Sequence, residues 1–565
     1  MSFAASALPD DPYAEPAPSF WRRHEGAIWA LVVFLFTVGL TIVSFPPFKA
    51  GEFAYAFAVP AVLWAYRRPR FKVFAWTVLG AQAVAWTILL SWLHHVTWIG
   101  LFLLGPFIGV WVGLWYLAAW WVMPRMLGRK TGLRLLAMLG LAGVWVLLEW
   151  TRTWVLGGFP WLPLAASQWQ QVSVLQVAAF TGAGGISFVV IAANIGFAAY
   201  AHRLFFERLR GINRRSQEFF LAMFLLIVCL SVHVQETVNR GHFLTPLGKV
   251  ALVQPHIPQT VKWDPAQAQG IFETLALTTQ RAALTFPDFI VWPEAVTPYA
   301  IQGNDGVRAW TEDLVSRVRV PLVMGSVAIE NAGQPDERWT NSAFVVDPEV
   351  GLQSVSYAKR RLVPFGEFVP FRPLLGWLEK VTDVGEGDFH PGDSGLPLHL
   401  SGRTGGFALG VLICYEDIFP QLARENVLLG AEALVVLTNN GWFGEGGAAY
   451  QHASHSVLRA VETRRPVIRC GNSGWSGWID EFGKIRGVMT DKRDSIYFRG
   501  SQTFEITRDS RWVERPSFYT QHGDWFVVFC LVLIGLGAGA IAFTPAPTPK
   551  ADDDELERPR GLGLQ

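Results

Sequence analysis

Eight apolar runs separated by short loops restrict the fold of this chain more than any other feature. A helix of about 20 apolar residues crosses the roughly 30 Å hydrocarbon core of a bilayer. We therefore predict a membrane domain of about seven spans over 27–235 and one further span within 521–545. Of the 565 residues, 51% are hydrophobic and only 16% are charged, which is typical of a membrane protein. The runs are 27–45, 53–66, 73–93, 97–122, 134–150, 184–201, 217–235 and 525–544, of which the second and fifth are the least certain spans.

Basic residues in every second loop predict how the chain is oriented. The positive-inside rule places the N-terminal segment 1–26 in the cytoplasm and the long polar region 236–520 on the other side. No small-residue cleavage site follows the first run, so we expect a retained anchor. The Pro- and Asp-rich tail 546–565 is predicted to be disordered and cytoplasmic. The basic residues are Arg22, Arg23, Arg67, Arg68, Arg70, Lys72, Arg125, Arg129, Lys130, Arg134, Arg203, Arg208, Arg210, Arg214 and Arg215, whereas the alternate loops hold only Lys49, His94, His95 and Arg152.

The polar region 236–520 alternates between short β-rich runs and amphipathic runs. Such alternation predicts helices that cover a sheet, and about 285 residues are enough for one substantial α/β domain. The predicted strands are 249–255, 289–292, 321–325, 342–347, 407–413, 433–438 and 466–470, and the predicted helices are 264–285, 306–319 and 449–463.

Three of these segments end in residues that suit acyl transfer. The run Val411-Leu-Ile-Cys-Tyr-Glu-Asp417 places Cys414 on a tight turn after a buried strand. A thiol needs a nearby base or cation to act as a nucleophile. Glu294, in Ile-Val-Trp-Pro-Glu, is a candidate base, and Lys359, in Ser-Tyr-Ala-Lys, is a candidate to stabilise the oxyanion together with the backbone N–H of Tyr415. Each residue alone has a plainer interpretation: a buried hydrophobic cysteine, a turn glutamate and a solvated lysine.

Together, the three segments resemble the Glu-Lys-Cys motif of the nitrilase superfamily. The likeness includes Leu362-Val-Pro-Phe-Gly-Glu-Phe-Val-Pro370 and Ile413-Cys-Tyr-Glu416. With membrane spans on both sides, the whole chain is similar to the apolipoprotein N-acyltransferase family. That resemblance implies an αββα sandwich outside the cytoplasm, joined to a multi-span helical membrane domain.

The resemblance also implies roles for individual residues. It makes Glu294, Lys359 and Cys414 the catalytic triad and gives Glu367, Tyr415 and Glu416 supporting roles. Trp263 and Trp442 would lie on mobile loops at a mouth that faces the membrane. One departure is Asn440, where family members often have aspartate, and it affects only a local loop contact.

The implied reaction moves an acyl chain in two steps. Cys414 would take the chain from a phospholipid as a thioester and pass it to the α-amine of the diacylglyceryl-cysteine that begins a lipoprotein. The expected partners are thus a phospholipid donor, a diacylated apolipoprotein and the lipid bilayer, with no cofactor and a monomeric enzyme. The expected location is the bacterial inner membrane, with the catalytic domain on the periplasmic side.

Other functions are less consistent with the residues. The net charge of +1 and the lack of a basic stripe argue against nucleic acid. His452 and His455 have helical spacing for a metal, but no third ligand cluster is visible, so no metal is expected. Cys229 and Cys530 lie in predicted spans, and Cys414 and Cys470 are expected to be free thiols. Two alternatives stay open: a membrane-anchored nitrilase-type amidase, and a non-enzymatic transporter or scaffold.

Overall fold

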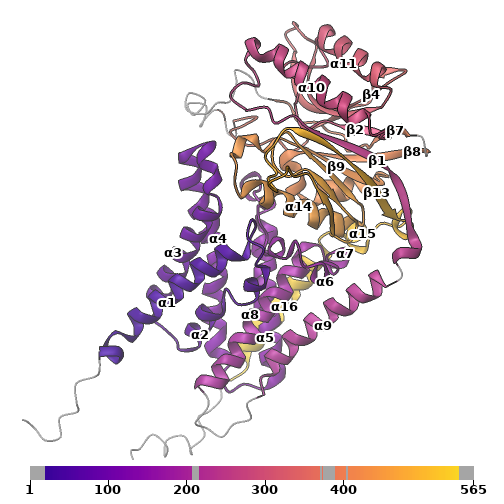
Figure 1. Cartoon of the computed structure of the whole chain (residues 1–565). Helices are drawn as coiled ribbons and strands as arrows, with labels where there is room; N and C mark the ends of the chain where they lie inside the picture. Colours follow the sequence, from indigo (N-terminus) through magenta and orange to yellow (C-terminus); the bar gives the residue numbers. More distant parts are fainter. Residues whose placement is uncertain are drawn as a thin grey trace, which may run out of the picture.

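The structure is a computed structural model that describes residues 20–206, 215–238, 240–369, 372, 389–402 and 405–545. In Figure 1, a bundle of long helices forms one end of the molecule, and sheets with their covering helices form the other. The predicted disordered tail 546–565 lies outside the described residues, as does most of the N-terminal segment 1–26.

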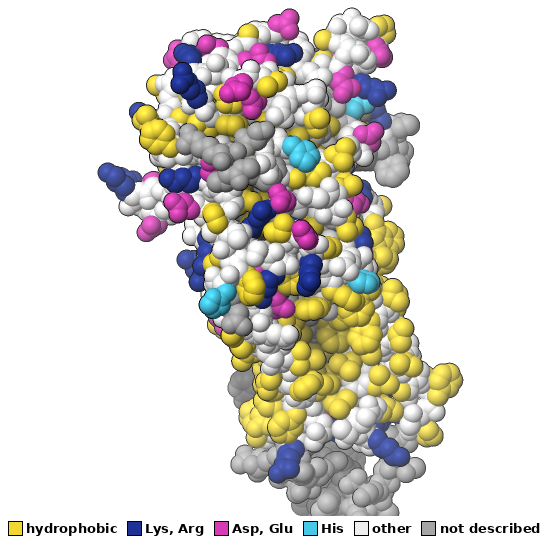
Figure 2. Space-filling model, turned by 90° about the vertical axis from the view of Figure 1, so that its right-hand side faces the viewer, with side chains coloured by type: hydrophobic (Ala, Val, Ile, Leu, Met, Phe, Trp, Pro, Cys, Tyr) yellow, Lys and Arg dark blue, Asp and Glu magenta, His cyan; other side chains and the backbone are white. Residues whose placement is uncertain are grey.

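Among the described residues, seven helices are long and apolar enough to cross a membrane. Figure 2 shows a broad apolar surface over this half of the molecule, with Lys and Arg side chains at its lower edge. Such a surface suits contact with lipid chains. Six of the helices precede the α/β domain and one follows it: α1 (Phe20–Ser44), α3 (Phe71–Leu89), α4 (Trp98–Met126), α5 (Thr131–Thr151), α8 (Ala183–Phe206), α9 (Gln217–Thr237) and α16 (Trp525–Phe543).

The predicted span 53–66 is wrong as a full-length helix. Its residues form a 3₁₀ turn, η1 (Gly51–Tyr55), and the eight-residue helix α2 (Val59–Tyr66), which is only about 12 Å long. The segment is apolar because it is buried within the bundle, where Ala58 and Ala61 have no exposed surface. It nevertheless returns the chain to the starting end of α1, since Arg67 pairs with Glu25.

The basic loops lie together at one end of the bundle. Arg134 at the start of α5 pairs with Glu218 at the start of α9, at 3.0 Å. Arg129 donates to the carbonyl of Thr544, just after α16, at 2.9 Å. The α/β domain lies at the opposite end of the same helices (Figure 1). This arrangement agrees with the charge pattern that set the predicted orientation.

Two mixed sheets form the α/β domain. The first has the strand order β13-β1-β2-β3-β4-β5, with β6 also paired to β4, and the second has the order β12-β11-β10-β9-β8-β7. The parallel strands β1-β2-β3 and β8-β9-β10 form the centres of the two sheets. The first sheet contains β1 (Leu244–Gln254), β2 (Phe289–Val291), β3 (Leu322–Glu330), β4 (Arg338–Asp347), β5 (Gly351–Leu352), β6 (Tyr357–Ala358) and β13 (Gly500–Asp509). The second contains β7 (Leu398–Gly402), β8 (Gly405–Ile413), β9 (Ala433–Thr438), β10 (Val467–Gly471), β11 (Gly477–Ile479) and β12 (Ile485–Val488).

Side chains that alternate along the strands separate the layers. Val250 and Leu252 on β1 face the second sheet, and they share a core with Val411 on β8. Ala251 and Val253 face the other way, toward α10 (Ala268–Ala283) and α11 (Asp305–Val318). On the far side, α13 (Pro420–Leu428) and α14 (Ala448–Thr463) cover the second sheet. The order of layers is therefore αββα, as predicted.

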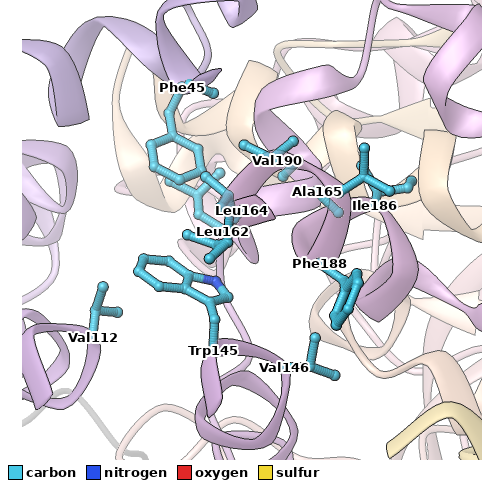
Figure 3. Packing of buried hydrophobic residues seen from close by; sticks show 14 of the residues in the cluster. Phe45, Val112, Trp145, Val146, Leu162, Leu164, Ala165, Ile186, Phe188 and Val190 are labelled. Atoms are coloured by element: carbon cyan, nitrogen blue, oxygen red, sulfur yellow. The ribbon is translucent and has the colours of Figure 1, made fainter. Parts of the chain in front are cut away.

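The α13 and α14 layer also packs on the membrane bundle, so the two parts share one apolar core. The segment between α5 and α8 fills this junction. In Figure 3, Leu162 and Leu164 from this segment lie beside Trp145 of α5. Hydrogen bonds add to the contact: Gln451 of α14 accepts from the indole N–H groups of Trp92 and Trp161, each at 3.0 Å. The α/β domain is thus fixed to the bundle through buried polar contacts as well as apolar ones.

Candidate active site

Three strand ends place the predicted triad in one region. Glu294 follows β2, Lys359 directly follows β6, and Cys414 follows β8 and opens the 3₁₀ turn η9 (Cys414–Ile418). β2 and β8 are parallel strands at the centres of the two facing sheets, and Glu294 and Cys414, which follow them, lie close enough to interact; α/β proteins usually bind ligands at the carboxyl ends of such strands. All three side chains are buried.

Cys414 has a left-handed backbone conformation, with φ of 52°. A non-glycine residue in this region carries a strain of roughly 1 kcal/mol or more, which is typical of a nucleophile on a sharp strand-to-helix turn. The side chain of Thr438 and the backbone N–H of Asn439, at the end of β9, lie close to the Cys414 thiol and lower its pKa against the larger effect of burial. These two donors are placed to stabilise a thiolate.

Lys359 connects two carboxylates. Its Nζ lies 2.8 Å from Oε1 of Glu367 and 3.3 Å from Oε1 of Glu294. The amide of Asn341 on β4 donates to the same two oxygen atoms, at 3.0 and 2.9 Å. Since an ammonium has three N–H donors, one donor of Lys359 remains for a substrate oxygen.

The second oxygen of Glu294 is the atom available to act as a base. Oε2 is buried and has no hydrogen-bond partner within bonding distance among the described residues. The carboxylate also interacts with the Cys414 thiol. Burial alone would raise the pKa of Glu294, but Lys359 and Lys262 outweigh it and hold that pKa below its usual value. Glu294 is therefore ionised near neutral pH and able to accept a proton.

The thiol itself is protonated at rest. Burial, together with the negative charge of Glu294, raises the pKa of Cys414 to about 12. A free thiolate would therefore be strongly disfavoured before substrate arrives. A reaction of this thiol as a nucleophile would therefore need a base that takes its proton as the sulfur attacks.

Lys262 is a second ammonium that the sequence analysis missed. Its side chain is 3% exposed, and it has neither a hydrogen bond nor an ion pair within the described part of the chain. Burial lowers the pKa of Lys262 to about 8, although Glu294 and Cys414 oppose this effect. The position of Lys262 next to Trp263 was the only signal in the sequence. It adds positive charge near the base and the nucleophile.

Glu416 and Tyr415 hold the turn at Cys414 through hydrogen bonds to neighbouring segments. Glu416 accepts from the Tyr357 hydroxyl and the Ile413 N–H, both at 2.8 Å, and from the Arg360 N–H at 2.7 Å. It thereby clamps the turn at Cys414 to the segment that carries Lys359. The Tyr415 hydroxyl points away from the triad and donates to the carbonyl of Gly158 in the junction segment, at 2.8 Å.

The two predicted mouth residues are partly exposed. Trp263 is 49% exposed and Trp442 is 40% exposed. Trp442 lies in η10 (Asn440–Phe443), and the neighbouring Phe443 ring lies 4.5 Å from the ring of Trp92 in η2 (Ser91–His95). The loop beside the nucleophile therefore rests directly on the membrane bundle.

His452 and His455 do not form a metal site in the part of the chain that the structure describes, where no group of three possible ligands occurs. Nε2 of His452 lies 3.1 Å from the carbonyl of Cys414, and Nδ1 lies 3.0 Å from the side-chain oxygen of Asn440. His455 accepts from the Leu162 N–H at 3.2 Å. Asn440 is therefore linked to the turn at Cys414 through His452. The departure from the family pattern at position 440 thus changes more than the local loop contact that we expected.

The α/β domain and the membrane bundle each match a known protein family. Residues 249–501 match the carbon-nitrogen hydrolase family, and residues 37–196 match the apolipoprotein N-acyltransferase N-terminal domain. The apolipoprotein N-acyltransferase of Geobacter metallireducens is 34% identical over 72% of this chain and 74% of its own length. That of Brucella melitensis is 32% identical over 66% of this chain and 69% of its own length.

Among solved structures, an amidase from Nesterenkonia sp. is 20% identical and covers 50% of this chain and 97% of its own, with a TM-score of 0.36. This likeness is too low to support a functional conclusion.

Proposed function

The chain belongs to the apolipoprotein N-acyltransferase family of acyl-transferring enzymes, and on that premise we propose that Cys414 carries the acyl chain as a thioester between two membrane-bound substrates. The donor is a phospholipid, and the acceptor is the α-amine of the S-diacylglyceryl-cysteine that begins a lipoprotein. The arrangement of Glu294, with Oε2 free beside the thiol, is the observation that carries the proposal.

In the first half-reaction, the Cys414 sulfur attacks the ester carbonyl carbon of the phospholipid while its proton passes to Oε2 of Glu294. The electron pair of the carbonyl moves to its oxygen, where the remaining N–H of Lys359 and the backbone N–H of Tyr415 stabilise the charge. Collapse breaks the bond to the glycerol oxygen, which takes the proton from Glu294. A lysophospholipid leaves, and the thioester remains.

In the second half-reaction, the neutral α-amine attacks the thioester carbonyl, and Glu294 accepts a proton from the amine nitrogen. Collapse expels the sulfur of Cys414, which takes that proton back, and the product is an amide. The enzyme thus returns to its starting state without a cofactor. Glu367 and Asn341 keep Lys359 oriented through both steps, and Glu416 keeps the nucleophile turn in register with it.

The junction with the bundle explains how such substrates reach the site. The loop of Trp442 rests on η2 at the end of the spans, so a lipid chain need not leave the membrane entirely. Holding both substrates in one leaflet raises their effective concentration at the enzyme. We place this junction at the periplasmic face of the bacterial inner membrane, with 27–235 and 521–545 as membrane parts and 236–520 as the catalytic domain of a monomer.

Mass analysis of the purified full-length protein tests the proposal. After incubation with phospholipid alone, the peptide that contains Cys414 is expected to gain the mass of one acyl chain, and adding a diacylated lipopeptide should remove it with formation of an N-acylated product. An acyl group on another residue would contradict the role of Cys414. Release of free fatty acid in place of the N-acylated peptide would favour the amidase-like hydrolysis instead.

A further inference from the structure

The carbonyl of the nucleophile is held by a buried histidine. Cys414 has a positive φ of 52°, and its carbonyl oxygen lies 3.1 Å from Nε2 of His452 on α14. The same Nε2 lies 2.9 Å from Oδ1 of Asp417. Both neighbours are oxygen acceptors, so Nε2 must carry a hydrogen, and it donates this hydrogen to the Cys414 carbonyl.

The other ring nitrogen shows which form of the imidazole is present. Nδ1 of His452 faces the amide of Asn440 at 3.0 Å. With the oxygen of this amide toward the ring, its buried Nδ2 has no partner. Turning the amide over lets Nδ2 donate to Nδ1 and also to the hydroxyl of Thr438, which lies 3.4 Å from the present oxygen position. The Thr438 hydroxyl is then left to donate to the Cys414 sulfur.

The charges around His452 favour a neutral imidazole, with its hydrogen on Nε2. Burial and Arg469 on β10 lower the pKa of His452, against the opposing effect of Asp417 in η9. Asp417 is already paired with Arg469 at 2.5 Å and accepts from Ser456 at 2.7 Å. On α14 itself, His455 also interacts with Asp417 and His452, and its pKa is lowered by burial. The ring of Trp161 lies 5.4 Å from that of His452.

We propose that His452 is a positioning residue for the oxyanion site, with Asn440 fixing its tautomer. The carbonyl of Cys414 and the N–H of Tyr415 belong to one planar peptide unit and point in opposite directions. A donor that holds the carbonyl from one side therefore aims the N–H toward the other side, where the substrate oxygen develops charge. This inference rests on the proposed function of Cys414 and adds a residue that touches neither substrate nor sulfur.

A pair of variants separates this role from simple folding. His452→Leu fills the space without a donor, whereas His452→Gln keeps an N–H near the position of Nε2. Loss of one aligned oxyanion donor costs roughly 10²–10³-fold in rate, so misaiming it should lower kcat for acylation at least about 30-fold in His452→Leu. His452→Gln should stay within about fivefold of the parent, and the KM for phospholipid should be unchanged in both.

Alkylation of Cys414 by iodoacetamide supplies a readout that a purely structural role would not separate. This reaction forms no oxyanion, so its rate in His452→Leu should stay within about threefold of the parent while thioester formation falls. An equal loss in both reactions would mean that His452 only maintains the thiol or the fold. Normal acylation by His452→Leu would likewise overturn the inference.

Asn440 is tested in the same assays. Asn440→Leu removes the partner of Nδ1, so only the contacts at Nε2 then orient the ring, and we expect about a tenfold loss of acylation, on the order of 1.4 kcal/mol. Asn440→Asp should keep the Nε2–H by protonating the ring, and stay within about threefold. Equal effects of the two variants would contradict the role of Asn440.

Cys414→Ala is the parallel control: activity without Cys414 would instead refute the proposed function.

Discussion

The membrane bundle and the α/β domain bury different kinds of polar groups. In the middle of the spans, the buried polar side chains are neutral and pair across helices, as Gln82 of α3 does by donating to the hydroxyl groups of Thr41 and Tyr116, each at 3.2 Å. In the α/β domain, charged side chains from separate strands bind one another, as in the group of Lys359 with Glu294 and Glu367.

This difference follows from what surrounds each half. Lipid offers no water and makes a buried charge costly, so polar groups in the middle of the spans are neutral and find their partners on neighbouring helices. The αββα sandwich has several strand ends that meet, so ions of both signs can be buried together. Acyl transfer needs such fixed charges, whereas its substrates need lipid. The comparison explains why the nucleophile lies where the two halves touch.

Cys414→Ala should give the largest effect. Without the sulfur no thioester forms, and acyl transfer should fall at least about 10³-fold, measured as N-acylation of a diacylated lipopeptide. Cys470→Ala is the matched control, because Cys470 is also buried but lies in the apolar core between the sheets, with its thiol directed at the carbonyls of Val253 and Val291. Near-normal transfer by Cys414→Ala would show that the buried charges serve another purpose.

Lys359→Met sharpens the comparison by removing one buried charge. We expect thioester formation to fall about 10²–10³-fold, since an oxyanion donor is lost. The melting temperature should fall as well, because the buried Glu294 and the partly buried Glu367 lose their partner, at a cost of about 3–5 kcal/mol. Arg308→Met breaks the exposed pair with Glu312 and should cost less than about 1 kcal/mol. Similar losses in both variants would contradict the buried, functional role of Lys359.

Gln451→Leu tests the junction. The change leaves the indole N–H groups of Trp92 and Trp161 and the carbonyl of Leu89 without their partner, and each unpaired buried group costs about 1–3 kcal/mol. Thermal unfolding in detergent should show a clear destabilisation, on the order of 4 kcal/mol. Gln269→Leu, on the exposed face of α10, should have little effect. If Gln451→Leu is no less stable to heat than Gln269→Leu, the bundle and the α/β domain are not held together by these hydrogen bonds.

Lys262→Met should have the smallest effect and the most specific pH dependence. The folded pKa of about 8 is below the usual 10.5, so the unfolded chain binds more protons between these values. The free energy of unfolding should therefore rise with pH from about 8 to 10.5. The variant lacks this rise and should be up to about 3 kcal/mol more stable at pH 7.

Transfer by Lys262→Met should nevertheless fall several-fold. Loss of the Lys262 charge raises the pKa of Glu294. The acidic limb of the pH–rate profile should therefore move to higher pH. A variant with unchanged stability at pH 7 and an unchanged profile would show that Lys262 is solvated rather than buried near the base.

Much of the fold was predictable because its central strands are strongly patterned. The predicted strands 249–255, 289–292, 433–438 and 466–470 correspond to β1, β2, β9 and β10, and the predicted helix 449–463 corresponds to α14. The short strands β5, β6, β7, β11 and β12 were missed, since two to five residues carry no clear periodicity. The ten-residue strand β13 was missed as well, because it is an edge strand with few buried apolar residues. The run 53–66 was wrongly predicted to be a membrane span, because burial inside a bundle and contact with lipid require the same apolar composition.

The candidate site divides in the same manner. Sequence by itself determined which strand ends carry a thiol, a carboxylate and an ammonium, and which end of the bundle carries the basic loops, because both depend on local order along the chain. Only the tertiary structure decided that Lys262 lies near the triad and that His452 holds the carbonyl of Cys414. Those contacts join residues far apart in sequence. The energies that matter there, desolvation and hydrogen-bond geometry, depend on what surrounds a side chain in space.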